Sequence, residues 1–202
     1  MPLQAILSTS VTQTAHSIWK NWVRPGDWVC DATAGNGHDT LLLTHLVGPS
    51  GRVWALDRQP AAILSTQQRL QRECSPQERA AVTLVEGCHS LWPLEIPERS
   101  IRLCVYNLGY LPGGDASQTT FTETTLRSLK NMEALLATEG LICCVCYPGH
   151  DEGAREAEAV CMWAADLPRQ EWSAHQINWM NRTRAPFIVL AYKQSHREAL
   201  DL

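Results

Sequence analysis

The stretch DATAGNGHDT, residues 31–40, decides the fold of this chain. It follows a short apolar run at 27–32, which predicts a strand, and it leads into 38–47, where leucines recur at helical spacing. A turn between a first strand and a first helix is the position at which an open α/β sheet binds ligands. Gly35 and Gly37 let the backbone bend tightly and approach a ligand without an intervening Cβ. The stretch therefore predicts an α/β domain with a ligand site at this turn.

The kind of ligand follows from the residues around the two glycines. The third glycine of the dinucleotide fingerprint would stand at position 40, which is Thr40 here, so the pattern for a nicotinamide cofactor is incomplete. Asp31 ends the first predicted strand, where a carboxylate suits the ammonium and sulfonium of S-adenosylmethionine. Asp57 ends the second, about twenty residues beyond Gly37, where an acid can accept hydrogen bonds from ribose hydroxyls. S-adenosylmethionine is thus the favoured cofactor, and the alternative is that both acids only cap turns.

Helices and strands alternate along the rest of the chain. Helices are predicted at 15–23, 38–47, 60–73, 118–137 and 154–165, and strands at 27–32, 52–57, 82–86, 101–106, 141–147, 171–178 and 187–192. Strands separated by helices form a mostly parallel sheet covered on both faces, so we expect the Rossmann-like α/β fold of class I methyltransferases with seven strands. The last two strands are joined without a helix, which predicts an antiparallel terminal hairpin. The helix at 118–137 is expected to end by Gly140.

Length and composition bound the class of protein. With 202 residues and 45% apolar side chains, the chain is sized for a single domain at 1–202, with the helical segment 1–25 packed on it. Neither a secretory signal nor a membrane span is expected from the apolar runs. The eight cysteines lack metal-ligand spacing and several stand in strand-like runs. We interpret them as core side chains in a reducing, cytoplasmic compartment, with no metal bound.

The charge balance bears on nucleic acid as a partner. A formal net charge of −4 gives no global attraction to RNA, which normally shows as a basic patch or domain. Local basic surface can form from two groups of side chains: Arg24, Arg52 and Arg58, and Arg182, Arg184 and Lys193. The alternative is that these cations are scattered over solvated helix and loop faces.

Two loops follow strands on the edge that carries the glycine turn. The segment 87–89 closes the third strand, where methyltransferase folds approach the adenine, so His89 either hydrogen-bonds the cofactor or finishes the loop. NLGYLPGGD, residues 107–115, resembles the Asn-Pro-Pro-aromatic motif of enzymes that methylate exocyclic amines, without its prolines. The carbonyl of Asn107 can hold an amine N–H with the lone pair directed at the methyl group, and Tyr110 can stack on an extruded base. The alternative is a Gly/Pro turn capped by Asn107.

A histidine follows the fifth strand on the same edge. In YPGHD, residues 147–151, His150 stands where it can take the proton that the amine loses, because an imidazole titrates near working pH. It can equally hydrogen-bond a phosphate, or remain a structural loop residue. An aliphatic ammonium has no lone pair, so we expect the site to favour the neutral amine by burial and by a nearby proton acceptor.

The combination of DATAGNGHDT at 31–40, NLGYLPGGD at 107–115 and YPGH at 147–150 resembles one family, the bacterial and plastid methyltransferases of the YtqB type. These were long labelled rRNA methylases and are now associated with tRNA 5-aminomethyl-2-thiouridine methylation (MnmM). The match continues into the late segment at 181–187. The resemblance implies that the substrate is the primary amine of that nucleoside at the wobble position, within a tRNA anticodon stem-loop.

The resemblance also implies roles for individual residues. The catalytic set would be Asn107, Tyr110 and His150, and the cofactor set Asp31, Thr33, Gly35, Asn36, Gly37, His38, Asp57, Cys88, His89, Asn107 and Leu108. One departure is Cys88, which stands where an acid near the adenine would be expected.

Other functions stay open at the level of sequence. A small-molecule amine or catechol methyltransferase is favoured slightly by the acidic net charge. A non-catalytic module that binds S-adenosylmethionine would keep Asp31 and Asp57 but have no use for the loop at 107–110. A dehydrogenase is disfavoured by Thr40. The sequence also leaves open whether two chains associate as a homodimer.

Overall fold

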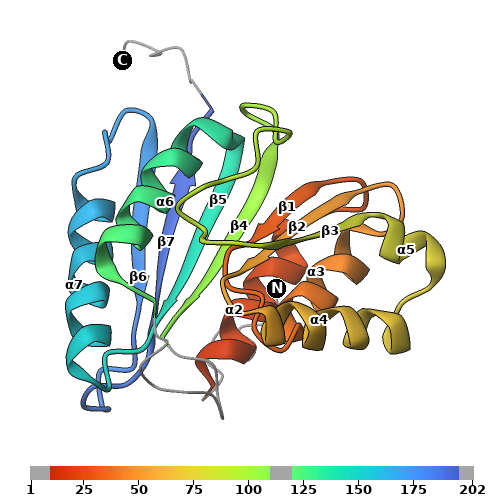
Figure 1. The fold of residues 1–202 in the computed structure, drawn as a ribbon. Coiled ribbons are helices and arrows are strands. Elements are labelled where there is room, and N and C mark those ends of the chain that lie inside the picture. Colours follow the sequence, from red (N-terminus) through yellow and green to blue (C-terminus); the bar gives the residue numbers. More distant parts are fainter. Residues whose placement is uncertain (1–9, 110–119, 196–202) are drawn as a thin grey trace.

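The fold is built on a seven-stranded sheet. The structure is a computed structural model that describes residues 10–109 and 120–195. The strands are β1 (Trp28–Asp31), β2 (Arg52–Asp57), β3 (Val82–Glu86), β4 (Ile101–Leu108), β5 (Leu136–Cys146), β6 (Trp172–Ile177) and β7 (Phe187–Lys193). They lie in the order β3-β2-β1-β4-β5-β7-β6 (Figure 1). The first five strands are mutually parallel, and β7 runs antiparallel to both β5 and β6. The predicted Rossmann-like sheet with its terminal hairpin is therefore confirmed.

Helices cover both faces of this sheet, as predicted. They are α2 (Val11–Trp22), α3 (His38–Val47), α4 (Pro60–Glu73), α5 (Pro76–Ala80), α6 (Thr122–Leu135) and α7 (Asp151–Ala165). Buried side chains of α2 and α3 share one core with the sheet, and those of α6 and α7 share a second core on the opposite face. Helices α4 and α5 pack beside α3 (Figure 1). No helix among the described residues has the length and apolar character needed to cross a membrane.

Cysteines fill much of the sheet interior. Cys30, Cys104 and Cys144 are fully buried in the core under α6 and α7, and Cys143 is fully buried in the core under α2 and α3. All eight cysteines are free thiols. Cysteine packs as a small apolar side chain, so these residues act as core filling, in agreement with the prediction for the strand cysteines.

The first described helix begins earlier than the apolar spacing predicts. It starts at Val11 rather than at residue 15 because Ser10 caps it, with the Ser10 hydroxyl accepting the Gln13 N–H at 3.4 Å. Trp19 of this helix is fully buried against the sheet. Helix α2 is thereby fixed over the face that also carries α3.

The boundary between α6 and β5 differs from the prediction. The helix ends at Leu135 and the strand begins at Leu136, so Gly140 lies inside β5 and does not end the helix. The amides of Arg99 and Ser100 each donate, at 3.0 Å, to the last helical carbonyls, and Leu136 already pairs with Ile101. Tertiary hydrogen bonds therefore end the helix before any residue that favours termination.

A short helix was missed by the sequence analysis. Helix α5 begins after Ser75, whose hydroxyl accepts the Glu78 N–H while the Glu78 carboxylate accepts the Ser75 N–H, which is a capping box. The signal was present in the sequence as a serine followed three residues later by glutamate. No apolar periodicity accompanies it, because none of its residues is buried.

Gly37 joins the glycine turn to the helix layer. It caps α3 with φ of +76°, and a Cβ there would lie 2.8 Å from the Thr66 Cα in α4. We expect Gly37→Ala to reduce the free energy of unfolding by about 3 kcal/mol, combining left-handed strain and overpacking. Gly48→Ala is the matched control, because Gly48 also has positive φ, +63°, but nothing lies within 4 Å of its Cβ position. Urea unfolding of both variants measures the difference, and equal losses would contradict a tight α3–α4 contact.

Candidate active site

A cavity of about 990 Å³ opens where the parallel strands end. Its wall combines the glycine turn after β1, the ends of β2 and β4, the loop after β3, one face of α2 and the segment containing Arg184 and Pro186. This volume is at the upper end of the range of small-molecule and cofactor sites. Of the predicted residues, the wall includes Thr33, Gly35, Asn36, His38, Asp57, His89, Asn107 and His150. These predicted residues therefore meet at one cavity, and their roles there stay predictions.

Asp57 joins the two loops that frame the cavity. Its Oδ2 accepts the Gly35 N–H at 2.9 Å, and its Oδ1 accepts the Gln59 N–H at 2.9 Å. The carboxylate at the end of β2 thus holds the glycine turn after β1 in place. It also lines the cavity, as expected of an acid that accepts ribose hydroxyls.

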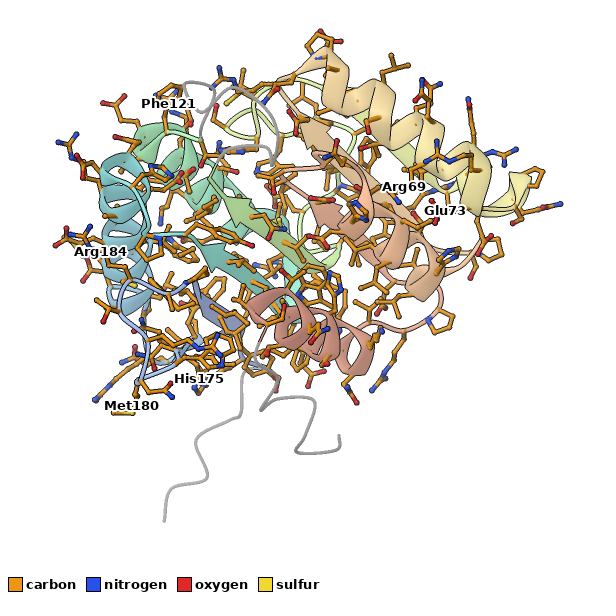
Figure 2. All side chains as sticks on the ribbon, turned by 90° about the horizontal axis from the view of Figure 1, so that it is seen from below. Arg69, Glu73, Phe121, His175, Met180 and Arg184 are labelled. Atoms are coloured by element: carbon orange, nitrogen blue, oxygen red, sulfur yellow. The ribbon has the colours of Figure 1, made fainter. Side chains whose placement is uncertain are left out.

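Helix α4 supports the glycine turn from behind. The Arg69 Nε donates to the Asn36 carbonyl at 2.7 Å, and its Nη2 lies 3.0 Å from His38 Nε2. Glu73, one turn further along α4, accepts from Arg69 Nη1 at 3.2 Å (Figure 2). The Arg69 guanidinium therefore holds the glycine turn on the side facing α4, and the other side of the turn lines the cavity.

Asp31 is not on the cavity wall. It is fully buried, and its carboxylate accepts the Thr40 hydroxyl at 2.6 Å and the Thr33 N–H at 3.1 Å. Burial, and next the nearby Asp39 carboxylate, raise the pKa of Asp31 to about 7. Thr40, which breaks the dinucleotide fingerprint, thus has a use of its own as the donor to this acid. Direct contact between Asp31 and a cofactor stays a prediction.

A second acid on the cavity wall besides Asp57 is Asp39, which the sequence analysis missed. Its Oδ1 lies 2.5 Å from His16 Nε2, and its Oδ2 accepts from Asn107 Nδ2 at 2.5 Å. The Asn107 backbone N–H donates to the Thr33 hydroxyl at 2.8 Å. Three elements, α2, α3 and β4, therefore meet in one hydrogen-bonded network on the cavity wall.

Weak signals for this network were present in the sequence. His16 stands three residues before Trp19, so helical spacing places it on the face that packs against the sheet. Asp39 is in the first turn of the helix that follows the glycine turn, where an acid is favourable for the helix dipole. Neither signal is specific, because a histidine on a packed helix face and an acid in a first helical turn are both common away from cavities.

His150 caps a helix. It is the N-cap of α7, and its Nδ1 accepts the Gly153 N–H at 3.0 Å. A Cβ at position 153 would lie 2.3 Å from the Tyr147 carbonyl oxygen, so this cap requires glycine there. A neutral imidazole that accepts at Nδ1 carries its proton on Nε2 and is a donor there. The arrangement favours the structural alternative for His150 over its use as a base.

The loop after β3 contributes His89 but not Cys88. His89 is 5% exposed and lies on the wall with Nδ1 3.3 Å from the Ala32 carbonyl oxygen, and burial lowers its pKa to about 4. It is therefore a neutral side chain that both lines the cavity and fixes the loop. The Cys88 sulfur accepts instead from Ser90 Oγ at 3.1 Å and is not on the wall.

Three other predicted residues are placed differently or lie outside the description. Gly37 is the N-cap of α3, where its positive φ shapes the glycine turn, and it is not on the cavity wall. Leu108 is buried in the core under α6 and α7, so its side chain does not reach the cavity, whereas Gly109 does. Tyr110, the predicted stacking residue, lies outside the described residues. Arg58 and Tyr147 line the cavity and were not in the predicted set.

Comparison with known proteins identifies the family of the chain. The chain matches a family model described as "Putative rRNA methylase" over residues 53–193. It is 39% identical over 191 residues to the chloroplastic tRNA (mnm5s2U34)-methyltransferase of Arabidopsis thaliana, which covers 92% of this chain and 70% of that protein. A putative rRNA-methylase of Clostridium thermocellum has a TM-score of 0.86 at 34% identity, over 92% of this chain and 98% of the other.

A second solved structure contains the demethylated cofactor. It is a putative methyltransferase of Streptococcus mutans in complex with SAH, with a TM-score of 0.79 at 28% identity, covering 92% of this chain and 99% of the other. Fold, glycine turn and relatives together define the class: the chain is an S-adenosylmethionine-dependent methyltransferase. Within that class it belongs to the family described as "Putative rRNA methylase".

The raised pKa of Asp31 makes stability depend on pH. Between its unfolded value of 3.8 and its folded value of about 7, the folded state keeps a proton that the unfolded state has lost. Stability contributed by this group is therefore fully present below pH 4, falls as pH rises and levels off above about 7. We expect Asp31→Asn to remove that slope because asparagine does not titrate. Its side chain can still accept from the Thr33 N–H and pair with the Thr40 hydroxyl. Relative to wild type, the free energy of unfolding of the variant should therefore rise with pH, by roughly 4 kcal/mol at most toward pH 8.

Urea unfolding of wild type and Asp31→Asn at a series of pH values from 4 to 8 measures this difference. A constant gap between the two proteins across the series would contradict the raised pKa.

Proposed function

We propose that this chain transfers the methyl group of S-adenosylmethionine to the primary amine of 5-aminomethyl-2-thiouridine at the wobble position of tRNA. The observation that carries the proposal is the position of Asn107, on a cavity wall that also holds Gly35 and Asp57. The name of the Arabidopsis relative, a tRNA (mnm5s2U34)-methyltransferase, supports the choice of substrate.

The residues of the cavity fit the cofactor. Asp57 offers a carboxylate for the ribose hydroxyls, and Gly35 leaves room beside it for a ligand to approach the backbone. Asn36 and His38 add polar groups on the same turn. When bound, S-adenosylmethionine supplies a methyl group activated by its sulfonium. The protein's own part is to hold that donor, exclude water and orient the acceptor.

Asn107 is the residue that would orient the acceptor. Its carboxamide oxygen can accept one N–H of the amine, which leaves the nitrogen lone pair to face the methyl group. Once the cationic donor offsets the charge of the Asp39 and Asp57 carboxylates, burial disfavours a second cation and so favours the nucleophilic neutral amine. Methylation turns the neutral amine into a secondary ammonium that leaves with its proton, so the transfer itself needs no base. His150, whose Nδ1 accepts the Gly153 N–H, therefore has no proton-transfer role in this step.

RNA can dock at the mouth of the cavity although the chain is acidic overall. Arg58 lies over the ring of Phe121, with Cζ 5.3 Å from the centroid, and Arg184 lines the cavity. Phe121 is 43% exposed, and it and Arg184 are seen on the cavity side of the molecule (Figure 2). Exposed cations beside an aromatic ring suit the phosphates and splayed bases of a single-stranded loop. The proposed partner is the tRNA anticodon stem-loop.

The proposal places the activity in the cytoplasm. The eight free cysteines suit a reducing compartment, where structural disulfides are rare.

The substrate is tested with tRNA that lacks this modification step. We expect the purified chain and S-adenosylmethionine to convert 5-aminomethyl-2-thiouridine in tRNA from a deletion strain to the 5-methylaminomethyl form, measured by nucleoside mass spectrometry. The same strain should accumulate the unmethylated nucleoside. Methylation of a metabolite extract with no methylation of tRNA would contradict the proposal and favour a small-molecule amine substrate.

The cofactor role of Asp57 is tested by an isosteric change. Asp57→Asn puts an NH₂ group where a carboxylate oxygen accepts hydrogen bonds, so we expect the affinity for SAH to fall by about 10- to 100-fold in calorimetric titrations. Asp27→Asn is the matched control, because Asp27 also accepts a backbone N–H, from Arg24 at 2.8 Å, and is not on the cavity wall. Equal affinities for SAH in the two variants would show that Asp57 does not bind the cofactor.

A further inference from the structure

The orientation of the Asn107 side chain is fixed by its neighbour. Its amide group lies 2.5 Å from Asp39 Oδ2. An ionised carboxylate only accepts hydrogen bonds, so the amide nitrogen must face Asp39 and the amide oxygen must turn the other way. The reverse orientation would bring two acceptor oxygens together. The carboxylate therefore decides which end of Asn107 is left for a substrate.

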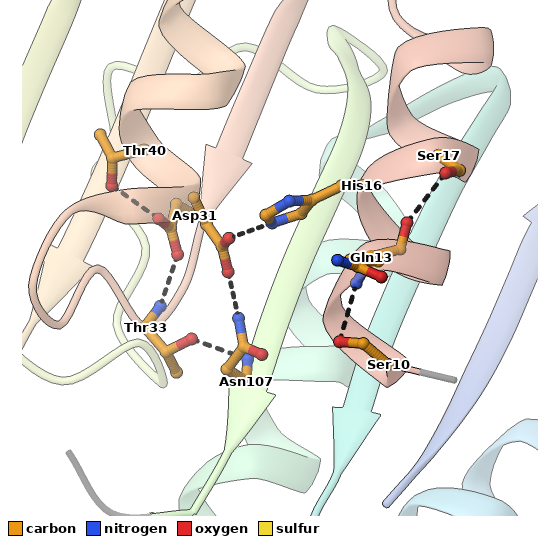
Figure 3. A network of polar contacts seen from close by, with 9 residues as sticks. Ser10, Gln13, His16, Ser17, Asp31, Thr33, Thr40 and Asn107 are labelled. Carbon is orange, nitrogen blue, oxygen red and sulfur yellow. Dashed lines mark hydrogen bonds and ion pairs between the residues drawn. The ribbon is translucent and has the colours of Figure 1, made fainter. Parts of the chain in front are cut away.

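Asp39 is itself held on its other side. His16 Nε2 lies 2.5 Å from Oδ1, and a nitrogen that faces a carboxylate carries a proton. The Asp39 and His16 side chains are only 13% and 25% exposed, so this pair is less screened by water than a surface ion pair. Figure 3 shows His16 reaching in from α2 and Asn107 from β4. The carboxylate cannot turn away from Asn107 without breaking its contact with His16.

We propose that Asp39, clamped by His16, is a positioning residue that presents the Asn107 amide oxygen to the substrate amine. The inference rests on the proposed function and adds two residues to it that the sequence analysis did not select. The chemistry requires an acceptor at this point. An amide turned the other way would present an NH₂ donor, which competes with the methyl group for the nitrogen lone pair of the amine.

A double-mutant cycle tests whether Asp39 acts through Asn107. Asp39→Asn keeps the shape of the side chain but offers one oxygen to two donors, His16 Nε2–H and Asn107 Nδ2–H. We expect the single-turnover methylation rate at saturating cofactor and tRNA to fall about 100-fold in Asn107→Ala and about 10-fold in Asp39→Asn. The double variant should fall no further than Asn107→Ala. Affinity for SAH should stay at its wild-type value in Asp39→Asn.

Losses that multiply in the double variant would overturn the proposal, because Asp39 would then act independently of Asn107. SAH affinity that falls in parallel with the rate would also overturn it, because Asp39 would then be a cofactor ligand.

Two variants of His16 separate hydrogen bonding from packing. His16→Gln keeps a side-chain N–H donor toward Asp39, whereas His16→Phe keeps the ring next to Trp19, whose centroid lies 5.0 Å away. We expect the Gln variant to retain more of the turnover rate than the Phe variant. His45→Gln is the matched control, since His45 also pairs with a carboxylate, Glu78 at 3.1 Å, away from the cavity wall, and it should keep full activity. A faster Phe variant than Gln variant would reduce His16 to a packing role and overturn the clamp.

A spectroscopic readout keeps this inference separate from the choice of substrate. In ¹⁵N–¹H spectra of the full chain, the Asn107 side-chain amide should show one proton shifted downfield by the carboxylate, and Asp39→Asn should move it upfield. An unchanged Asn107 signal would overturn the inference whether or not the tRNA is methylated. Wild-type protein with no activity on the tRNA, but with this shift present, would overturn the proposed function alone.

Discussion

The parallel alignment of β1, β2 and β4 is the constraint on which the site depends. Parallel strands end at one edge of a sheet, so the sheet itself brings together the loops that follow them. The hydrogen bond from Gly35 N–H to Asp57 then locks the first loop to the end of the second strand. Helix α2 completes the wall by adding His16 from the face that also buries Trp19.

Three carboxylates converge on this edge, and their mutual repulsion has a chemical meaning. Asp39 and Asp57 both contribute to the raised pKa of Asp31, after burial itself. Negative charge collected in a partly buried cavity favours a cationic ligand over one that carries phosphates. An S-adenosylmethionine molecule, with its ammonium and sulfonium, offsets this repulsion, whereas a dinucleotide adds to it. Asp57, the carboxylate that the proposed function assigns to the cofactor, therefore disfavours a phosphate-bearing ligand at this edge.

The sequence predicted the architecture well because local patterns and global fold agree. Helices α3 and α4 and strands β2 and β3 have the predicted bounds. Three of these elements stop at a turn residue: α3 before Gly48, β2 at Asp57 and β3 before Gly87. The boundary at Leu136 escaped prediction because it is set by hydrogen bonds from Arg99 and Ser100, which are distant in sequence. Asp31 and Asp39 stand eight positions apart in one motif, and only the packing of α3 reveals which of them reaches the cavity.

The central claim is that this edge of the sheet grips a sulfonium cofactor between the glycine turn, Asp57 and the loop at Asn107. A crystal structure of the full chain with SAH tests it most directly. The account predicts density for the ribose against the Asp57 carboxylate and for the homocysteine end toward Thr33 and Asn107. Density for SAH elsewhere on the protein, with these side chains untouched, would contradict it.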